Sequence, residues 1–387
     1  MPFIEVTTDR LAAGGDAIGR GGDGKVVFVA GALPGERVRA EVVTDKRDFT
    51  KARTVAVLEP SRWRRTAPCA FVADGCGGCD WQHVDPVGQG ELKASIVRDA
   101  LARLGGLPGA VVDVAPALPE VGYRTTVRLG VRRGAVGFRA GRSHEVVAVD
   151  RCLVAHPLLD ELIAGGRFLG AREVTLRCGA RTGERLALAS PSSVGLGLPD
   201  DVAQGPEASY HEIVAGSSYR ISAESFFQSR PDGADALVAA VREAVAGVDG
   251  PVLDAYGGVG LFAKALARGG DRPVTLVERS GSSIRDARHN LAGLDATIVE
   301  SAMEDWEPSP YPVVVADPAR EGLGRAACDV LTATGAERFV LVSCDAASLG
   351  RDTRLLTEAG YRHVRSTLID LFVNTAHVEV VTEFRLA

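Results

Sequence analysis

The chain has 387 residues, enough for two or three domains, and its 46% hydrophobic and 24% charged residues are those of a folded globular protein. No stretch approaches the ~18 consecutive apolar residues of a membrane-spanning helix, and the first ten residues lack the pattern of a secretion signal, so we expect a cytoplasmic protein with no membrane partner. The net charge of −6 argues against a general attraction to nucleic acid, but residues 1–66 hold 12 Lys and Arg against 9 Asp and Glu. A basic amino-terminal piece on an acidic body is typical of an appended binding module.

Residues 3–58 predict a small β-barrel. Short strands are expected at Ile4–Thr8, Lys25–Ala30, Glu36–Thr44 and Lys51–Leu58, with Gly-rich turns between them. A solvated β-meander without a ligand is the alternative. Basic side chains near this region are interleaved with aromatic ones, and cations that contact phosphates beside rings that stack on bases favour RNA binding. This basic set comprises Lys46, Arg47, Lys51, Arg53, Arg62, Arg64 and Arg65, with Phe49 and Trp63.

Three of the seven cysteines, Cys69, Cys76 and Cys79, fall within eleven positions. Disulfide frameworks are typical of short secreted chains, and the odd count in a long chain favours a metal or cluster site with separate free thiols. A helix is expected over Glu91–Leu104, because its apolar residues recur on one face. Strands with tight turns are expected over residues 123–149, and a surface loop over residues 190–208.

After about residue 235, strands and helices alternate. Continuous apolar runs at 252–254, 274–277, 313–316 and 339–342 indicate a doubly wound, mostly parallel sheet. A Gly-rich turn, residues 254–260, follows the first run. Glycines let a ligand approach the backbone at a strand's carboxyl end.

Glu278 closes the second strand, where its carboxylate can accept hydrogen bonds from both ribose hydroxyls of a nucleoside cofactor. The spacing of Gly257, Gly258 and Gly260 is not the G-x-G-x-x-G of dinucleotide binding. S-adenosyl-L-methionine therefore fits better than NAD.

Two further strand ends carry polar residues, Asp317–Gly322 and Ser343-Cys344-Asp345. Cys344 ends a strand close to an expected helix start, and a helix amino terminus lowers a thiol's pKa. We expect Cys178 and Cys328 to be inert packing residues. Glu379, at the start of the last strand, is either a base or an exposed strand carboxylate.

The motifs Asp-Pro-Ala-Arg-Glu-Gly, Val-Ser-Cys-Asp and Thr-Ala-His-Val-Glu, in this order after Phe226-Phe227-Gln228, resemble those of the RNA uracil-5 (5-methyluridine) methyltransferases. Residues 1–58 resemble the TRAM domain that heads many members. The resemblance implies an RNA-binding, OB-like TRAM barrel (1–60), a central β-rich α+β domain with a cysteine site (61–230) and a Rossmann-like class I methyltransferase domain (231–387).

By this resemblance, Cys344 is the nucleophile and Glu379 the proton acceptor, while Phe226 lies near the RNA bases. The residues implied around S-adenosyl-L-methionine are Gln228, Tyr256, Glu278 and Asp317. A [4Fe-4S] cluster is implied at Cys69, Cys76, Cys79 and Cys152; structural zinc is the alternative. The chain departs from the family pattern at Gly257 (often Cys), Leu261 and Ala302 (polar residues), Val373-Asn374 (a Pro-containing pair), and a Cys69–Cys76 spacing one residue longer than a common form.

The implied activity is methylation of carbon 5 of a specific uridine by a monomeric enzyme, through a covalent cysteine–uracil adduct. Ribosomal RNA, 23S in particular, is the favoured substrate and transfer RNA the alternative. An RNA-binding protein with an inactive methyltransferase half is the non-enzyme alternative. A TRAM-bearing radical enzyme that methylthiolates tRNA would need C-x3-C-x2-C spacing, which is absent. A cytosine-5 methyltransferase would be expected to carry a different cysteine motif.

Overall fold

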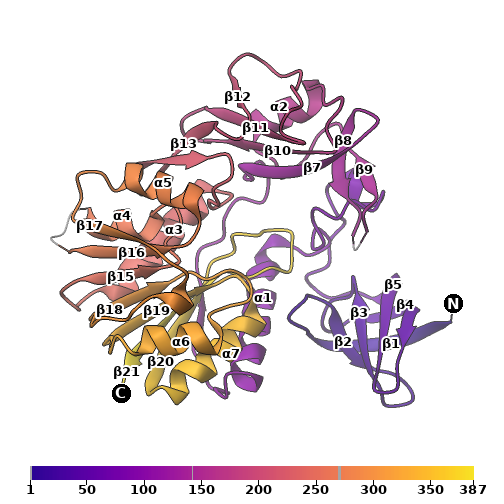
Figure 1. Cartoon of the computed structure of the whole chain (residues 1–387). Coiled ribbons are helices and arrows are strands. Elements are labelled where there is room, and N and C mark those ends of the chain that lie inside the picture. Colours follow the sequence, from indigo (N-terminus) through magenta and orange to yellow (C-terminus); the bar gives the residue numbers. More distant parts are fainter. Residues whose placement is uncertain (1, 142, 269–271) are drawn as a thin grey trace.

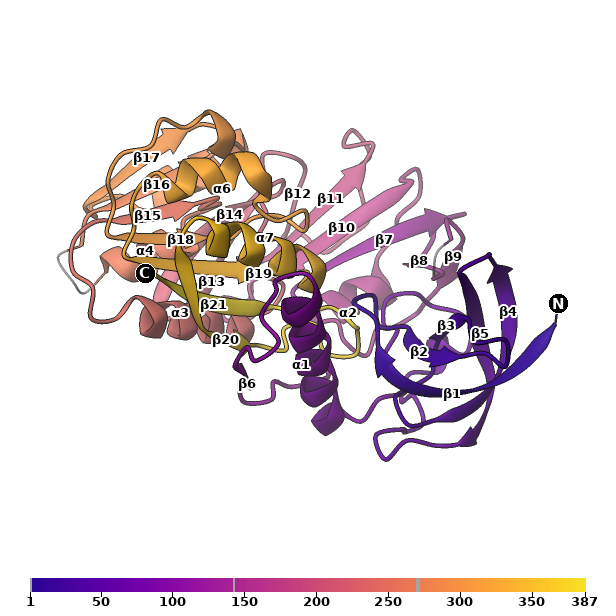
Figure 2. The same cartoon turned by 90° about the horizontal axis from the view of Figure 1, so that it is seen from below.

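The computed structural model describes residues 2–141, 143–268 and 272–387. Three parts follow one another along the chain: an amino-terminal barrel, a central sheet, and a larger sheet covered by helices (Figure 1). The amino terminus lies at the barrel and the carboxyl terminus at the helix-covered sheet (Figures 1 and 2). Within the described ranges, no helix has the length and apolar character needed to cross a membrane.

The barrel is closed, with strand order β1-β2-β3-β5-β4, which confirms the expected barrel. Its strands are β1 (Phe3–Leu11), β2 (Ala17–Arg20), β3 (Val26–Ala30), β4 (Arg37–Asp45) and β5 (Phe49–Glu59). Closure pairs every strand on both sides and leaves no free edge. Strand β2 was not predicted, because four residues between two Gly-rich turns show too little alternation to recognise.

Part of the expected basic surface is used inside the molecule instead. Arg64 pairs with the fully buried carboxylate of Glu36, and Arg65 lies 2.6 Å from Glu120. Arg62 stacks on the Trp63 ring at 4.4 Å and pairs with a carboxylate of the following helix. Arg64 and Arg65 therefore hold the linker after the barrel in place, which corrects their assignment to an RNA-facing patch, whereas the Arg62 side chain stays exposed at the surface.

The central sheet has strand order β12-β11-β10-β7-β8-β9. Its strands are β7 (Thr126–Arg132), β8 (Ala135–Arg139), β9 (Val146–Ala148), β10 (Glu173–Cys178), β11 (Arg185–Ser190) and β12 (Val202–Gln204). Helix α2 (Pro157–Gly165) packs Leu159 and Leu162 into the core of this sheet. Short β12 lies inside the expected 190–208 loop.

The carboxyl-terminal sheet has strand order β17-β16-β15-β18-β19-β21-β20-β6. Its strands are β6 (Val112–Val114), β15 (Val252–Ala255), β16 (Val274–Glu278), β17 (Ala296–Glu300), β18 (Val313–Ala316), β19 (Arg338–Ser343), β20 (Tyr361–Leu368) and β21 (Val380–Leu386). Strands β15 to β19 are parallel, as predicted. Strand β21 runs antiparallel to β19 and β20, so the sheet as a whole is mixed.

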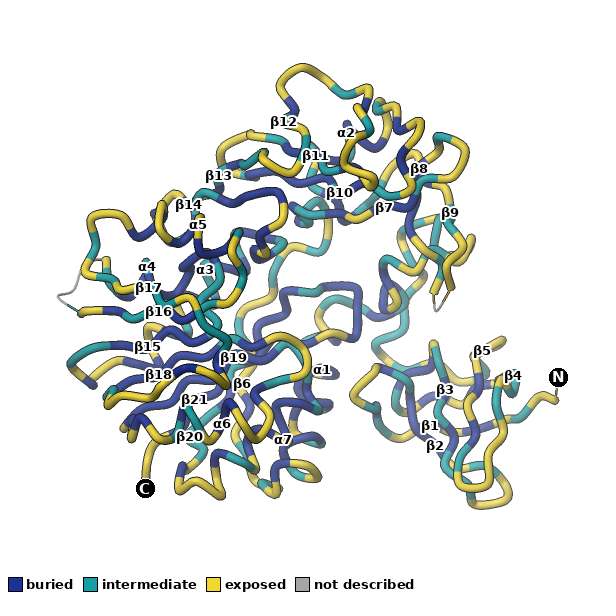
Figure 3. Tube along the Cα trace, viewed as in Figure 1, coloured by how far each residue is buried: buried dark blue, intermediate teal, exposed yellow. Residues whose placement is uncertain are grey.

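Helices cover both faces of this sheet, and the apolar runs explain why. Val313 and Val315 point into one core, whereas Val314 and Ala316 point into the other. A strand buried on both faces needs an unbroken apolar run rather than an alternating one, and the central strands β15, β18 and β19 are buried along their whole length (Figure 3). The helices are α3 (Pro231–Val245), α4 (Leu261–Ala267) and α5 (Gly281–Asn290) on one face, and α1 (Pro86–Arg103), α6 (Gly324–Thr332) and α7 (Ala346–Glu358) on the other.

Helix α1 and strand β6 lie within the expected central domain, residues 61–230, but join the carboxyl-terminal sheet. β6 pairs in parallel with β20, and Ile96 and Leu101 of α1 pack into the core that contains α6 and α7. The Asp85 side chain caps α1 by accepting a hydrogen bond from the backbone N–H of Val87. The hairpin of β13 (Ser209–Val214) and β14 (Ser217–Ser222) packs in the core shared with α3, α4 and α5. The remaining helical elements are short 3-10 turns, Ala70–Val72 and Met303–Asp305.

Candidate active site

A cleft of about 540 Å³ lies at the carboxyl ends of the parallel strands. Ligands bind at this edge of open α/β sheets, because the strand-to-helix loops meet there. The structure brings all six residues predicted for the cofactor and the chemistry into its lining: Gln228, Tyr256, Glu278, Asp317, Cys344 and Glu379. These residues come from the segment before α3, from the ends of β15, β16, β18 and β19, and from the start of β21.

The Gly-rich turn between β15 and α4 approaches the sheet closely. A Cβ on Gly257 would lie 2.5 Å from Leu276 Cγ, so a larger residue would require a shift there. Gly260 has a φ of +91°, which disfavours any side chain. Tyr256 has a φ of +60°, an unfavourable conformation for an aromatic residue. Backbone strain of this kind concentrates at binding and active sites.

The carboxylate of Glu278 is fixed by three backbone donors. The N–H of Gly258 donates to Oε2 at 3.0 Å, while those of Arg279 and Ser280 donate to Oε1 at 2.8 and 2.7 Å. The carboxylate thus joins the Gly-rich turn to the end of β16. Each carboxylate oxygen has two lone pairs, so Oε1 is fully used and Oε2 can still accept one hydrogen bond from a ligand in the cleft.

Cys344, Asp317 and Glu379 form an acidic group in the cleft. Burial raises the pKa of Cys344 to about 12, helped by the nearby carboxylates of Glu379 and Asp317 and opposed by Arg320. Burial also raises the pKa of Asp317 to about 7, and burial together with Asp317 raises that of Glu379 well above its ordinary value. Because like charges at close range oppose ionisation, these groups do not all carry a negative charge together.

The expected lowering of the Cys344 pKa by a helix amino terminus is therefore wrong. Helix α7 does begin at Ala346, but the side chain of Asp345 caps it by accepting a hydrogen bond from Ser348 N at 2.8 Å. Burial of the thiol, with the nearby carboxylates of Glu379 and Asp317, raises the pKa although the helix amino terminus lies close by. A pKa of about 12 favours the neutral thiol form of Cys344 at physiological pH.

An exposed aromatic ring stands at the edge of the cleft. Phe226 is 71% exposed, although the neighbouring Phe227 and Gln228 are buried. Its loop is held by Asp286, which accepts hydrogen bonds from two serines of the loop, and by Arg177, which donates to three loop carbonyls at 2.6 to 3.2 Å. The ring is therefore held at the surface by a rigid support.

Residues that the sequence analysis did not single out also line the cleft. Arg320 lies in the Asp-Pro-Ala-Arg-Glu-Gly motif and lowers the pKa of Cys344 by its positive charge. Its position in that motif is the sequence feature that could have identified it as a cleft residue. Phe372, between Asp370 and Glu379, lines the cleft as well, and the sequence offered no signal for it.

The four predicted ligand cysteines line one small, separate cavity, together with Phe71, Phe138 and Arg124. All seven cysteines are free thiols, and Cys178 and Cys328 are buried in the cores, as predicted. Burial raises the pKa of Cys152 to about 11. Within the described residues, no three His, Cys, Asp or Glu side chains are grouped closely enough to hold a single metal ion. Four thiol side chains are a ligand set that both iron–sulfur clusters and structural zinc use.

Known proteins match this chain over nearly its full length. The TRAM domain family matches residues 3–55. A Streptomyces coelicolor protein described as an uncharacterized RNA methyltransferase is 36% identical over 97% of this chain and 91% of its own length. A 23S rRNA (uracil(1939)-C(5))-methyltransferase of Chromohalobacter salexigens is 33% identical over 97% of this chain and 87% of its own.

One solved structure shows the same fold over nearly the full length. It is the Pyrococcus abyssi tRNA (uracil-54, C5)-methyltransferase in complex with S-adenosyl-L-homocysteine. The TM-score is 0.75 at 23% sequence identity, covering 98% of this chain and 100% of that one. The order of barrel, central sheet and mixed sheet is thus that of a known protein architecture.

Proposed function

The chain belongs to the RNA uracil-5 methyltransferase family, and we propose that it transfers the methyl group of S-adenosyl-L-methionine to carbon 5 of a specific uridine in RNA. The observation that carries this proposal is the shared cleft, in which Cys344 and Glu379 lie together with a fixed acceptor for a nucleoside, Glu278. S-adenosyl-L-methionine supplies an electrophilic methyl group when bound. The Glu278 carboxylate, held by three backbone N–H groups, would accept a hydrogen bond from a ribose hydroxyl at Oε2.

The cleft residues then account for the chemistry at the uracil ring. Carbon 5 of uracil is too weak a nucleophile to take a methyl group unaided. When Cys344 Sγ loses its proton and bonds to carbon 6, the electron pair of the C5–C6 double bond becomes available on carbon 5, which is covalent catalysis. Carbon 5 forms its bond to the methyl group as the bond between that methyl group and the sulfonium sulfur breaks, which leaves S-adenosyl-L-homocysteine. Glu379 then accepts the carbon 5 proton. The C5–C6 double bond re-forms as the thiolate leaves.

The positions of the charges support these roles. Arg320 favours the anionic form of the Cys344 sulfur, while Asp317 and Glu379 oppose it until one of them carries a proton. Glu379 is 2% exposed, and burial favours its neutral form. A carboxyl group with a raised pKa is a stronger base when ionised and is suited to removing a carbon-bound proton.

RNA would be held by the barrel and by Phe226. Lys46, Arg47 and Lys51 are exposed on the barrel and can contact phosphates. Phe226 offers a surface on which a base can stack at the mouth of the cleft. A uridine in a duplex must leave the base stack to reach Cys344, which costs a few kcal/mol and favours loop substrates.

We favour 23S ribosomal RNA as the substrate, because the full-length relative of Chromohalobacter salexigens is named for it. Transfer RNA is the second candidate, since the Pyrococcus abyssi enzyme of the same fold is named for a tRNA uridine. Mapping 5-methyluridine in total RNA from a strain that lacks the gene decides between them. We expect at least one ribosomal position to lose the modification and to regain it when the gene is restored. Loss from tRNA alone would move the assignment to tRNA, and an unchanged map would contradict the proposed activity.

The four-cysteine cavity is proposed to hold a [4Fe-4S] cluster. Anaerobically purified protein should contain about four iron and four sulfide atoms per chain. Cys79→Ser should lose the iron and sulfide. Cys328→Ser should keep them, because Cys328 lies in the core with α6 and α7 and not at the four-cysteine cavity. Stoichiometric zinc in place of iron would overturn the assignment.

A further inference from the structure

The segment between β20 and β21, residues 369–379, is a closed loop, here called the base loop. The N–H of Ile369 donates to the carbonyl oxygen of Glu379 at 2.8 Å and so joins the two ends of the loop. Phe372 and Glu379 both line the cleft. No hydrogen bond joins the Glu379 carboxylate to another side chain or backbone group of the described ranges, and Glu379 is 2% exposed. The direction of this carboxylate therefore depends on the path of the loop backbone.

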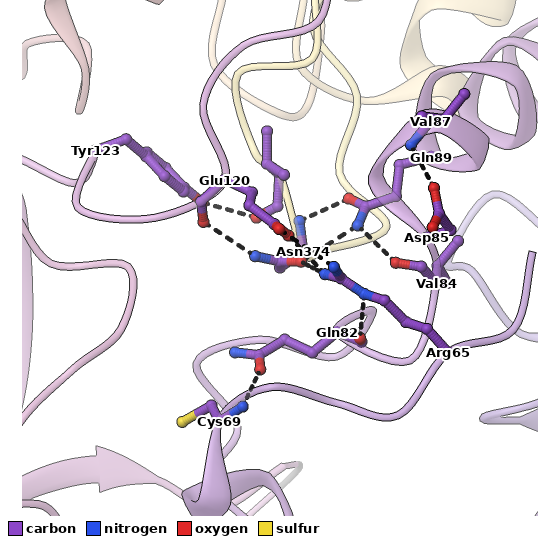
Figure 4. Close-up of polar contacts among 11 residues, drawn as sticks. Arg65, Cys69, Gln82, Val84, Asp85, Val87, Gln89, Glu120, Tyr123 and Asn374 are labelled. Atoms are coloured by element: carbon purple, nitrogen blue, oxygen red, sulfur yellow. Dashed lines mark hydrogen bonds and ion pairs between the residues drawn. The ribbon is translucent and has the colours of Figure 1, made fainter.

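Asn374, at the tip of the base loop, is fully buried and is bonded through both its backbone and its side chain (Figure 4). Its N–H donates to Gln89 Oε1 at 2.7 Å, and its carbonyl accepts from Trp81 N at 2.9 Å. Its Oδ1 accepts from Gln89 Nε2 and from Arg65 Nη2, each at 3.2 Å, and its Nδ2 donates to the Glu120 carbonyl at 3.2 Å. Asn374 thus joins the base loop to four separate segments, three through its side chain and one through its backbone carbonyl.

All these partners precede β6 or lie just after it, far from the loop in sequence. They belong to the linker after the barrel, the cysteine-bearing segment, helix α1 and residues 119–123. Further bonds support the same contact. They are Lys93 Nζ to Asp370 Oδ1 (2.6 Å) and to the Phe372 carbonyl (3.0 Å), Tyr123 Oη to the Val373 carbonyl (2.7 Å), and Ala376 N to Asp80 Oδ1 (3.2 Å).

The backbone of Asn374 also limits which residues fit. Its φ is +67°, and asparagine is one of the few non-glycine residues that adopt this region readily. Val373 beside it packs on Cys79, Tyr123 and Val154, at the four-cysteine cavity. The tip of the loop is thereby fixed by a turn, an apolar contact and a set of buried hydrogen bonds, whereas the Glu379 side chain itself is held by none.

We propose that Asn374 is a positioning residue that anchors the base loop to the cysteine-bearing half of the chain and thereby directs the Glu379 carboxylate at the substrate. The inference rests on the proposed function, because it takes Glu379 as the proton acceptor. Asn374 touches neither the cleft nor the substrate. Its effect is transmitted through the backbone of the four residues between it and Glu379.

The test compares Asn374→Gly, which permits the positive φ but removes the side-chain bonds, with Asn374→Asp, which keeps the Oδ1 acceptor. Thr382→Val is the control, because it removes a buried hydrogen bond to Ser366 within the same β20–β21 pair and leaves the loop unchanged. We expect Asn374→Gly to lower kcat by about 10- to 100-fold, the effect of roughly 1 Å of misplacement. RNA–protein adduct should accumulate, since proton removal follows methyl transfer. Asn374→Asp should recover part of kcat, and Thr382→Val should match wild type.

A merely structural role gives a different pattern: kcat and adduct formation fall together, and that result would overturn the proposal. Unchanged kcat in folded Asn374→Gly would overturn it too. Should that variant not fold, Gln89→Leu removes the α1 side of the same contact and carries the same expectation.

Hydrogen exchange without RNA or cofactor separates this inference from the proposed function. Asn374→Gly should speed exchange in residues 369–379 and not in β15 to β19, and unchanged exchange in the loop would contradict the anchor. Full turnover by Glu379→Gln would remove the role of Glu379 and that of Asn374 with it. Failure of Asn374→Gly alone to affect turnover would leave the proposed function intact.

Discussion

Cys344→Ala should abolish methyl transfer while leaving S-adenosyl-L-methionine bound with its ordinary affinity. Without the sulfur, no bond forms at carbon 6, and carbon 5 stays too weakly nucleophilic to take the methyl group. We expect a loss on the order of 10⁵-fold or more, the scale seen when a covalent nucleophile is removed. Methyl incorporation into RNA measures turnover, and calorimetry measures the Kd of the cofactor, expected to change by less than about twofold.

Cys328→Ala is the matched control, because Cys328 is a buried thiol in helix α6 and does not line the cleft. That variant should keep its activity once its folding has been checked by thermal unfolding. Turnover retained by Cys344→Ala would refute the covalent route, and loss of cofactor binding would show that Cys344 has a structural role in the cleft.

Glu379→Gln should trap a covalent RNA–protein adduct that survives a denaturing gel. The amide has nearly the same shape as the carboxylate but cannot accept the carbon 5 proton. The reaction therefore stops after methyl transfer, with the RNA still bonded to Cys344. General-base removal costs about 10²- to 10⁴-fold in turnover. The adduct itself should form about as fast as in wild type, because burial already favours the neutral form of Glu379 and the amide is neutral too.

Two controls make the Glu379 result specific. Glu321→Gln changes an exposed carboxylate in the Asp-Pro-Ala-Arg-Glu-Gly motif and should give wild-type turnover. The double variant Cys344→Ala, Glu379→Gln should form no adduct, which assigns the bond to the Cys344 sulfur. If Glu379→Gln turned over normally without adduct, another group would be the base.

The sequence predicted the parallel part of the carboxyl-terminal sheet because burial on both faces leaves an unbroken apolar run. It did not predict that β6 pairs with β20, since strands from distant parts of the chain pair by tertiary packing rather than by any local pattern. The same limit applies to Arg64 and Arg65, which look like solvated cations in the sequence. Their partners, Glu36 and Glu120, are 28 and 55 residues away.

The site was predictable to the extent that strand ends share one edge of a sheet. Cys344 and Asp317 follow buried strands, so their meeting in one cleft follows from topology. The pKa of Cys344 was not predictable, because a local argument sees the following helix and misses carboxylates brought from β18 and β21. Asn374 was noted only as a departure from the family pattern, and its role depends on partners more than 250 residues away.

Membership of the RNA uracil-5 methyltransferase family argues against the two other functions that the sequence left open. A radical enzyme that methylthiolates tRNA shares the TRAM domain but not the full-length match to RNA methyltransferases. An RNA-binding protein with an inactive methyltransferase half has no need for one cleft lined by all six residues proposed to act on the cofactor and the uracil. An assay of methyl transfer distinguishes an inactive RNA-binding protein from the proposed enzyme.

The most direct test uses purified protein, methyl-labelled S-adenosyl-L-methionine and total RNA from a strain lacking the gene. Digestion to nucleosides should place the label in 5-methyluridine at one or a few discrete positions, with none transferred by Cys344→Ala. Label in any other nucleoside, or equal labelling by Cys344→Ala, would contradict carbon 5 methylation through a cysteine adduct.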